Sequence, residues 1–216
     1  MIMRQTMYGQ PYTACDMTSP DATVLVRQYQ NAVFMPIMRV HQMHGLPRFP
    51  FLWGGAEHQV AFRHALNMRY RFLPYLYSLA HHAHLYGRPL GHPASFDFPE
   101  YALGSETYMV GGELLPADVS TTHNKPPDNG ENSTTVNLPN GTSWYLWNGT
   151  TATPGGQTVQ HTVALDEMVF YVRQGSILPL QAAEVQHSDL VGGLLLVHVY
   201  GGRDGAFEMV RARDLW

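Results

Sequence analysis

Apolar residues in the first part of the chain recur mainly at helical spacing. The shorter of two such stretches has apolar positions three or four residues apart, at Ala22, Leu25, Tyr29 and Val33. Just before it, Ser19-Pro20-Asp21 predicts a helix start, with Ser as the N-cap, Pro at the first helical position and Asp in the first turn. Short apolar runs on either side of this helix predict strands at Gln10–Cys15 and Phe34–Val40.

A longer helix is predicted from about Glu57 to about Tyr86. Its buried face is marked by apolar residues three or four positions apart, at Phe62, Ala65, Phe72, Leu76, Leu79 and Ala83. Pro74 predicts a kink inside this helix, and Gly87 is typical of a helix C-cap. The resulting strand–helix–strand–helix order, with polar residues at the strand ends, is the order expected for two βα units of a barrel.

From residue 87 onward the pattern changes to short strands separated by turns rich in Gly, Pro and Asn, such as Pro139-Asn140-Gly141. The strand candidates are Tyr108–Val110, Glu113–Val119, Thr134–Leu138, Ser143–Trp147, Gln157–Val163, Met168–Val172 and Ser176–Leu180. Their spacing predicts a β-sandwich over residues 87–185. The polar stretch Thr121–Glu131 predicts a loop, and residues 186–216 begin another β-rich unit.

Composition narrows the classes of ligand and partner. The chain has 216 residues, of which 44% are hydrophobic, so a sizeable core is possible. Only 14% are charged while 12% are aromatic, a balance that suits neutral ligands such as sugars better than phosphates. The net charge of −4 argues against a nucleic-acid partner, and no apolar run is long enough for a membrane span. With Cys15 as the only cysteine, an internal disulfide is excluded.

Several stretches carry patterns that are more specific than periodicity. Two are individually distinctive, Arg69-Tyr70-Arg71-Phe72-Leu73-Pro74-Tyr75-Leu76-Tyr77 and Val172-Arg173-Gln174-Gly175-Ser176-Ile177-Leu178-Pro179-Leu180. Others are Gly9-Gln10-Pro11 leading to Asp16, Pro36-Ile37-Met38-Arg39-Val40-His41, and Tyr108-Met109-Val110-Gly111-Gly112-Glu113-Leu114-Leu115-Pro116-Ala117. In this order along the chain, they resemble the family 31 glycoside hydrolases, the family of α-glucosidase-type enzymes.

The resemblance implies a fold that is α/β followed by all-β. Residues 1–86 would be the last βα units of a truncated (β/α)8 catalytic barrel, 87–185 a proximal β-sandwich, and 186–216 the start of a distal β-domain. A retaining glycosidase needs two carboxyl groups, a nucleophile and an acid/base. The resemblance places both upstream of Met1, so we expect no catalytic residue in this chain and no activity from the chain alone.

The resemblance also assigns three polar residues to the sugar pocket. It makes His41 a donor to a hydroxyl of the sugar in the −1 subsite, and Asp16 a carboxylate at the end of the seventh barrel strand. Arg39 lies two residues before His41, on the same side of a strand, and would pair with a carboxylate such as Asp16. The alternatives are that His41 is an ordinary hydrogen-bonded histidine and that Asp16 makes only structural hydrogen bonds.

The implied function is a retaining, exo-acting α-glycoside hydrolase that removes α-linked glucose from an oligosaccharide or glycoside, without a cofactor. The family's Gly-Gly-Phe turn is absent, because Asp16 runs directly into Met17-Thr18-Ser19, so the Phe that lines the sugar pocket is missing. An α-xylosidase or an α-glucosyltransferase is therefore an alternative, and a non-catalytic carbohydrate-binding protein is another. The tail Arg211–Trp216 also departs from the acidic stretch that the family has there.

Histidines and tryptophans are further candidates for binding. The spacings His41/His44 and His81/His84 are those of H-x-x-H pairs, but no acidic partner completes a ligand set, and we expect no metal site. Tryptophans can stack on sugars, and the candidates are Trp53, Trp144 and Trp147. We expect Trp144 and Trp147 to pack in the sheets instead.

Three N-x-S/T sequons lie close together, at Asn132, Asn140 and Asn148. As candidate glycosylation sites they point to a surface made in the secretory pathway. The alternative is chance occurrence in a stretch rich in Asn, Thr and Gly.

Overall fold

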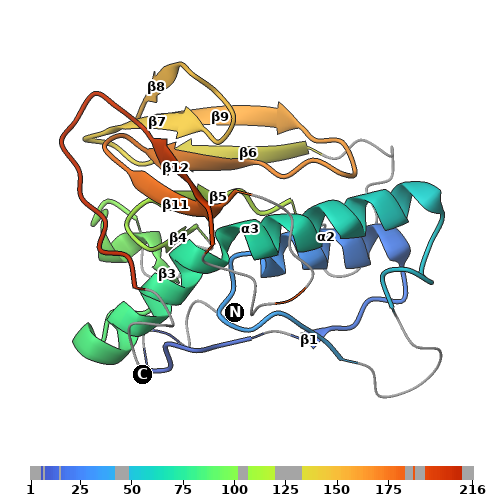
Figure 1. Ribbon diagram of the computed structural model, residues 1–216. Helices are drawn as coiled ribbons and strands as arrows, with labels where there is room; N and C mark the ends of the chain where they lie inside the picture. The colour runs from blue at the N-terminus through green and yellow to red at the C-terminus, as the bar shows by residue number, and fades with distance from the viewer. Residues whose placement is uncertain are drawn as a thin grey trace.

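Two helices form one layer of the molecule, and most of the β-strands lie above them in Figure 1. The computed structural model describes residues 6, 8–14, 16–41, 49–101, 107–119, 133–182, 187 and 193–210. Helix α2 (Ala22–Ala32) packs beside helix α3 (Ala56–Tyr86), with the rings of Tyr29 and Phe62 meeting edge to face at 4.8 Å between centroids. The pairing buries the apolar stripes that the sequence places on both helices.

The start of α2 differs from the prediction. Asp21 is the N-cap, not Ser19, because its carboxylate accepts the backbone N–H of Val24 at 2.9 Å. The Ser19 hydroxyl instead accepts the backbone N–H of Asp21 at 3.2 Å. Pro20 therefore lies ahead of the helix and not in its first turn. Ser and Asp are both good N-cap residues, and here it is the carboxylate of Asp21 that reaches the first turn of the helix.

Helix α3 confirms the predicted long helix and its end. Gly87 is the C-cap, with φ +72° in the left-handed region, and its N–H bonds to the carbonyl of Ala83 at 3.0 Å. Pro74 lies inside the helix, whose axis changes direction along its length (Figure 1). The Ser78 hydroxyl donates to the Pro74 carbonyl at 2.8 Å, a side-chain bond to the carbonyl four residues earlier in the helix.

The strands predicted around α2 are much shorter than expected. Only β1 (Asp16–Met17) and β2 (Arg39–Val40) form, as a parallel pair in which Asp16 faces Arg39. The described part of the predicted strand Gln10–Cys15 is not strand, Cys15 lies outside the described residues, and residues 33–37 are turns and bends. A parallel pair with a helix between its strands is the βα arrangement that the pattern predicted.

The β part is built on a six-stranded antiparallel sheet. In spatial order its strands are β3 (Gly91–Pro93), β4 (Tyr108–Val110), β5 (Leu114–Pro116), β10 (Phe170–Arg173), β7 (Ser143–Leu146) and β8 (Ala152–Pro154). A short 3₁₀ helix, η1 (Ala94–Phe96), follows β3. Two further antiparallel pairs are β6 (Ser133–Leu138) with β9 (Gln157–Thr162), and β11 (Ile177–Gln181) with β12 (Leu195–Val199).

Each strand predicted between residues 108 and 180 is present, β4 with the predicted ends and the other six with an end shifted. The largest difference is β5, which covers only the middle of the predicted Glu113–Val119. Strands β3 and β8 were not predicted. Strand β12, which lies beyond residue 186, pairs with β11, which lies before it. The division into 1–86, 87–185 and 186–216 stays a prediction.

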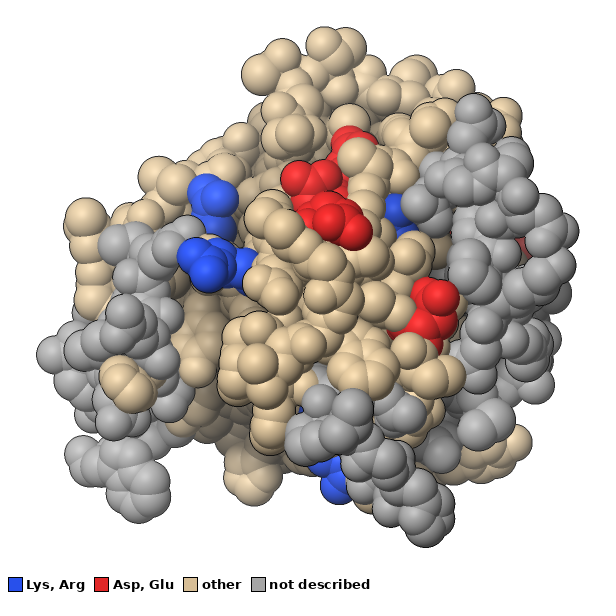
Figure 2. All heavy atoms as spheres, turned by 90° about the vertical axis from the view of Figure 1, so that its right-hand side faces the viewer, with Lys and Arg blue, Asp and Glu red and all other residues tan. Residues whose placement is uncertain are grey.

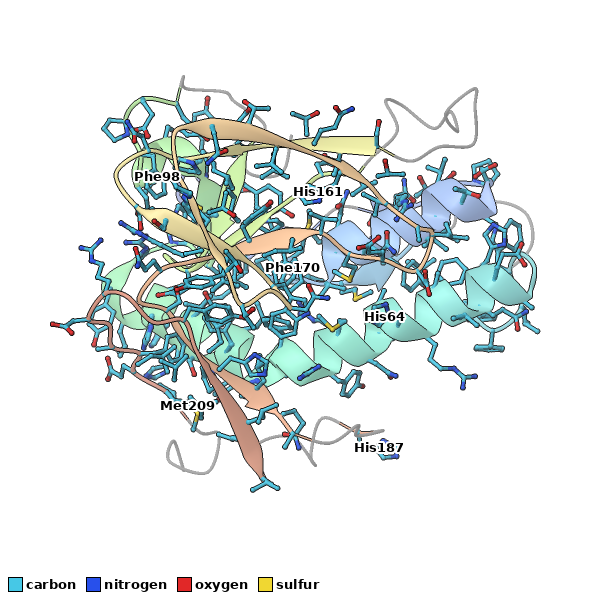
Figure 3. All side chains as sticks on the ribbon, turned by 90° about the horizontal axis from the view of Figure 1, so that it is seen from above. His64, Phe98, His161, Phe170, His187 and Met209 are labelled. Atoms are coloured by element: carbon cyan, nitrogen blue, oxygen red, sulfur yellow. The ribbon has the colours of Figure 1, made fainter. Side chains whose placement is uncertain are left out.

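Strand β10 shows how the six-stranded sheet joins two cores. Phe170 and Val172 face the helices and belong to one buried cluster, whereas Tyr171 points to the other face, toward β6 and β9. In the first cluster the Phe170 ring meets those of Phe34 and Phe72 at 5.0 and 5.8 Å between centroids. Figure 3 shows Phe170 between the sheet and α3. The helices and the β part thus share one continuous core.

The face shown in Figure 2 carries few charged side chains, as the low charged fraction of the sequence predicts. Within the described ranges no helix is long and apolar enough to cross a membrane. The predicted loop Thr121–Glu131 and the tail Arg211–Trp216 lie outside the described residues.

Candidate functional site

Asp16, Arg39 and His41 come together at the paired strands β1 and β2. Asp16 and Arg39 are register partners, and Nη2 of Arg39 donates to Oδ1 of Asp16 at 2.8 Å. The same Nη2 lies 3.0 Å from Nδ1 of His41. The backbone N–H of His41 also bonds to the carbonyl of Met17 at 3.3 Å, which extends the pairing of the two strands. The expected pairing of Arg39 with Asp16 is therefore present.

The hydrogen bond from Arg39 fixes the tautomer of neutral His41. A guanidinium can only donate, so Nδ1 of His41 must be the acceptor and its proton must sit on Nε2. Within the described part of the chain Nε2 has no partner. Arg39 therefore contacts both His41 and Asp16 and joins the three side chains.

The cluster is open to solvent. The side chains of Arg39 and Asp16 are 54% and 43% exposed, and toward described residues they make no other side-chain hydrogen bond. A guanidinium, a carboxylate and a ring N–H together can bind hydroxyl groups, which both donate and accept. They are not a glycosidase pair, because only one of the three is a carboxyl group.

A half-buried arginine, Arg69 of α3, holds the turn that leads into β2. Its guanidinium donates to the carbonyls of Val33 at 2.8 Å, Met35 at 2.5 Å and Pro36 at 3.1 Å. Burial lowers the pKa of Arg69 to about 10. Arg69 belongs to one of the two distinctive stretches of the sequence, but no role was predicted for it.

The three tryptophan candidates differ in burial: Trp144 is buried, whereas Trp53 and Trp147 are partly buried. Trp144 is fully buried, and its indole N–H donates to the carbonyl of Pro139 at 3.0 Å. Trp147 stacks between Phe170 and His198, with ring centroids 5.0 and 5.1 Å away. Both pack in or against the sheets, as predicted. Trp53 is partly buried against the core that the helices share with the sheet.

No group of His, Cys, Asp and Glu in the described ranges is placed to hold a metal ion. His81 and His84 lie on one face of α3 with ring centroids 6.4 Å apart, and His44 is outside the described residues. Of the sequons, Asn140 and Asn148 are exposed, while Asn132 is also outside them. Their glycosylation stays a prediction.

Comparison with known families decides the family of the chain. Residues 1–79 match the glycosyl hydrolases family 31 TIM-barrel domain, and residues 87–178 match the glycosyl hydrolase family 31 C-terminal domain. The chain belongs to glycosyl hydrolase family 31. The first match ends inside α3, and the second begins at Gly87, the C-cap of that helix.

Individual family 31 proteins match over most of this chain. Human neutral alpha-glucosidase C is 34% identical over 192 residues, which are 84% of this chain and 20% of that protein. The alpha-xylosidase of Saccharolobus solfataricus is 31% identical over 197 residues, covering 89% of this chain and 25% of its own length. The chain therefore spans a quarter or less of these relatives.

A solved family 31 structure gives the same picture. The dextranase of Flavobacterium johnsoniae, complexed with isomaltotriose, has a TM-score of 0.79 and 26% sequence identity to this chain. The match covers 93% of this chain and 25% of the dextranase chain. The helices and sheets described above are thus arranged as in an intact member of the family.

Proposed function

We propose that this chain is the C-terminal part of a retaining, exo-acting α-glycoside hydrolase that removes α-linked glucose. In this proposal β1 and β2 are the seventh and eighth strands of the (β/α)8 barrel, followed by the proximal β-sandwich and the start of the distal β-domain. The family matches support it, because the TIM-barrel match covers residues 1–79 and the C-terminal-domain match follows at 87–178. The neutral alpha-glucosidase relative favours glucose as the sugar.

The contact among Asp16, Arg39 and His41 is the observation on which the proposal rests. At the end of a barrel strand, side chains on this side face the active site. His41 would donate its Nε2 proton to a hydroxyl of the sugar in the −1 subsite. Arg39 would hold His41 and Asp16 in position through the two contacts of its Nη2.

The catalytic carboxyl groups are proposed to come from residues outside the printed sequence. A retaining glycosidase needs two carboxyl groups about 5 Å apart, and the proposed sugar site holds Asp16 alone. The chain by itself should therefore not hydrolyse an aryl α-glucoside. Turnover above background that copurifies with the chain would contradict the assignment of the missing carboxyl groups.

A hybrid enzyme tests the proposal directly. This chain would replace the matched C-terminal part of human neutral alpha-glucosidase C, which would supply the rest of the barrel. We expect turnover of an aryl α-glucoside, and a fall in kcat/KM of roughly 10- to 100-fold in the His41→Ala hybrid, because one transition-state hydrogen bond is lost. His187→Ala is the matched control, since His187 is exposed and lies away from the sheets and helices (Figure 3). A folded hybrid without turnover would argue against the proposal.

An α-xylosidase is the second candidate. Two observations favour it: the missing Gly-Gly-Phe turn after Asp16, and the alpha-xylosidase relative at 31% identity. A xylose ring lacks the hydroxymethyl group of glucose, so a changed pocket wall alters the balance between the two sugars. The ratio of kcat/KM for aryl α-glucoside to that for aryl α-xyloside, measured on the same hybrid, separates the two candidates.

A further inference from the structure

A polar pocket lies where the C-terminal end of α3 meets three other segments. They are the turn between β4 and β5, the turn between β10 and β11, and residues 203–208 that follow β12. The cavity has a volume of about 440 Å³, within the range of small-molecule sites. The last of these segments is tied to α3, because the backbone N–H of Val210 donates to the Ser78 hydroxyl at 3.0 Å. Figure 3 shows the chain near Met209 beside that end of α3.

The shape of the pocket depends on close backbone approaches at glycines. A Cβ on Gly205 would overlap the carbonyl oxygen of Gly175, where the turn after β10 crosses the segment after β12. Gly175 has φ +88°, a left-handed conformation that side chains disfavour. Gly111, on the opposite wall, has φ +63° and no room for a Cβ beside Tyr75 and Glu113. The two walls therefore take this form only with glycine at these positions.

Part of the lining is fixed by hydrogen bonds within the protein. Glu113 accepts the Tyr75 hydroxyl at 2.7 Å and the backbone N–H of Gly112 at 2.8 Å. Burial, and then the negative charge and hydrogen bond of Glu113, raise the pKa of Tyr75 well above its ordinary value, so its hydroxyl stays a donor. On the next wall Asp97 binds Arg88 at 2.7 Å and His92 at 2.8 Å. These groups hold their positions before any ligand arrives.

Other groups in the lining make no side-chain hydrogen bond to a described residue. The guanidinium of Arg173 lies 5.1 Å from the centre of the Phe98 ring and makes no hydrogen bond to a described residue. Arg203 and Asp204 are exposed at the rim, again without a partner in the described ranges. The pocket thus offers strong donors and acceptors within one volume.

This mixture of charges selects for a neutral ligand with many hydroxyl groups. A phosphate would meet the carboxylates of Glu113, Asp204 and Glu208, and a cation would meet the guanidinium groups of the three lining arginines. Hydroxyl groups both donate and accept, so they can pair with the two kinds of group at once. Phe207, whose ring stacks on Tyr75 at 5.2 Å between centroids, adds an apolar wall for the ring of a sugar.

We propose that this pocket binds a neutral oligosaccharide. It shares no residue with Asp16, Arg39 and His41. The proposal goes beyond the hydrolase function, and it does not require the chain to be part of an active enzyme. Sugar bound here would be held by the C-terminal end of α3 and the sheet, independently of the cluster on β1 and β2.

The test is calorimetric titration of the printed chain with isomaltotriose and with maltotriose. We expect weak, saturable binding of one sugar per chain. Arg173→Ala should weaken it about tenfold or more, because hydrogen bonds to a charged donor are lost. Ala206→Trp should block the pocket by filling it while leaving every charge in place. Arg63→Ala is the control, because Arg63 is exposed on α3 and outside the pocket, and it should leave binding unchanged.

Other results would overturn the proposal. No saturable binding by the folded chain would do so, as would binding that both pocket variants leave intact. Tighter binding of inorganic phosphate than of either sugar would make this an anion site. Loss of binding in His41→Ala, with Arg173→Ala unaffected, would place the sugar on the β1–β2 cluster and support the proposed function instead. Conversely, an inactive hybrid with normal pocket binding would leave this proposal standing and count against the hydrolase.

Discussion

The buried Arg27 and the half-buried Arg69 hold loops in this protein, whereas the exposed Arg39 holds other side chains. Arg27 of α2 is 1% exposed and donates to the side chain of Gln30 and to four main-chain carbonyls of residues 163–167. Burial lowers its pKa to about 10, against the raising effect of Glu167 and Asp166. Arg69 does the same for the turn before β2. A planar group with five donors suits such carbonyl clusters better than a lysine does.

Replacing Arg27 by methionine should destabilise the protein strongly. The substitution keeps most of the packing volume but removes a donor from four carbonyls. Those of Ala164 and Leu165 keep a second donor, whereas those of Val163 and Glu167 lose the Arg27 bond, and a cost of about 3–5 kcal/mol in the free energy of unfolding is expected. Urea titration of the wild type and the variant measures this cost. Arg63→Met, on the exposed face of α3, is the control and should change the free energy by less than about 0.5 kcal/mol. A similar small effect of Arg27→Met would show that the loop is held by other contacts.

Arg39→Lys should separate stability from function. The ion pair with Asp16 is exposed, so the free energy of unfolding should change by less than about 1 kcal/mol. A lysine amine cannot easily keep the geometry that joins Asp16 to His41, and kcat/KM of the hybrid enzyme should fall roughly 10- to 100-fold. Arg63→Lys serves as the control in both measurements. If kcat/KM were unchanged, Arg39 would have no part in placing His41.

Among the helices and strands, those whose sequence itself carries an apolar pattern and a cap were predicted best. Helix α3 has its apolar stripe and its C-cap glycine within its own sequence, and its predicted bounds are nearly those observed. Strands β1 and β2 have two residues each and exist only through their mutual pairing across α2, which periodicity does not reveal. The Gly-His-Pro of β3 and the Ala-Thr-Pro of β8 show no alternation, and pairing with β4 and β7 makes them strands.

The candidate site was predictable in part for the same reason. Arg39 and His41 are two residues apart, so the sequence alone places them on one side of a strand. Asp16 joins them only through the register of β1 with β2, and the family resemblance, not the spacing, singled it out. The role of Arg69 was missed because it acts on carbonyls more than thirty residues away, as its bond to Val33 shows, and no pattern in the sequence marks that contact.

Two glycines after β12 should respond differently to the same substitution. A Cβ at Gly205 would overlap the carbonyl of Gly175, so Gly205→Ala should force the segment away from the β10–β11 turn. The expected loss is about 1–3 kcal/mol in the free energy of unfolding, with weaker sugar binding in the pocket. Gly201→Ala is the control, because a Cβ there meets nothing within 4 Å. Equal melting temperatures of the two variants would show that the crossing is not tightly packed.

At the scale of the whole molecule, tyrosines in the shared core should make the free energy of unfolding fall at alkaline pH. Burial raises the pKa of Tyr29 to about 12 and that of Tyr200 to about 12, the latter against the opposing charge of Arg71. Both belong to the core between helices and sheet, and in the unfolded chain each titrates near pH 10. Their contribution to stability is therefore complete below pH 10 and is lost as the pH rises toward 12.

The measurement is the free energy of unfolding from pH 8 to 12, with tyrosinate absorbance followed in parallel. Stability should fall above pH 10, and Tyr29→Phe should make that fall shallower, because phenylalanine has no proton to lose. Since no hydrogen bond of the Tyr29 hydroxyl to a described residue is found, the variant should be nearly as stable as the wild type at pH 7. A pH dependence unaltered by Tyr29→Phe would mean that other groups cause it.

The same core predicts that the barrel segment and the C-terminal domain unfold together. Phe34 and Phe72 from the first and Phe170 from the second form one aromatic cluster, with Phe34 and Phe72 5.4 Å apart between ring centroids. Helical circular dichroism reports mainly α2 and α3, whereas two of the four tryptophans, Trp144 of β7 and Trp147 just after that strand, report the β part by fluorescence. If the core is continuous, both signals should follow one urea transition, because neither layer keeps its buried face covered without the other.

Phe170→Ala tests this coupling. Removing the ring leaves a cavity between α3 and β10, at a cost of about 3–5 kcal/mol, and both signals should move to lower urea concentration by the same amount. Phe51→Ala, which removes a ring that is 68% exposed, should move neither. Should the helical signal be lost first while fluorescence keeps its wild-type midpoint, the sheet would be stable without the helices. The C-terminal domain would then fold as an independent unit, and its stability would not depend on packing against the barrel segment.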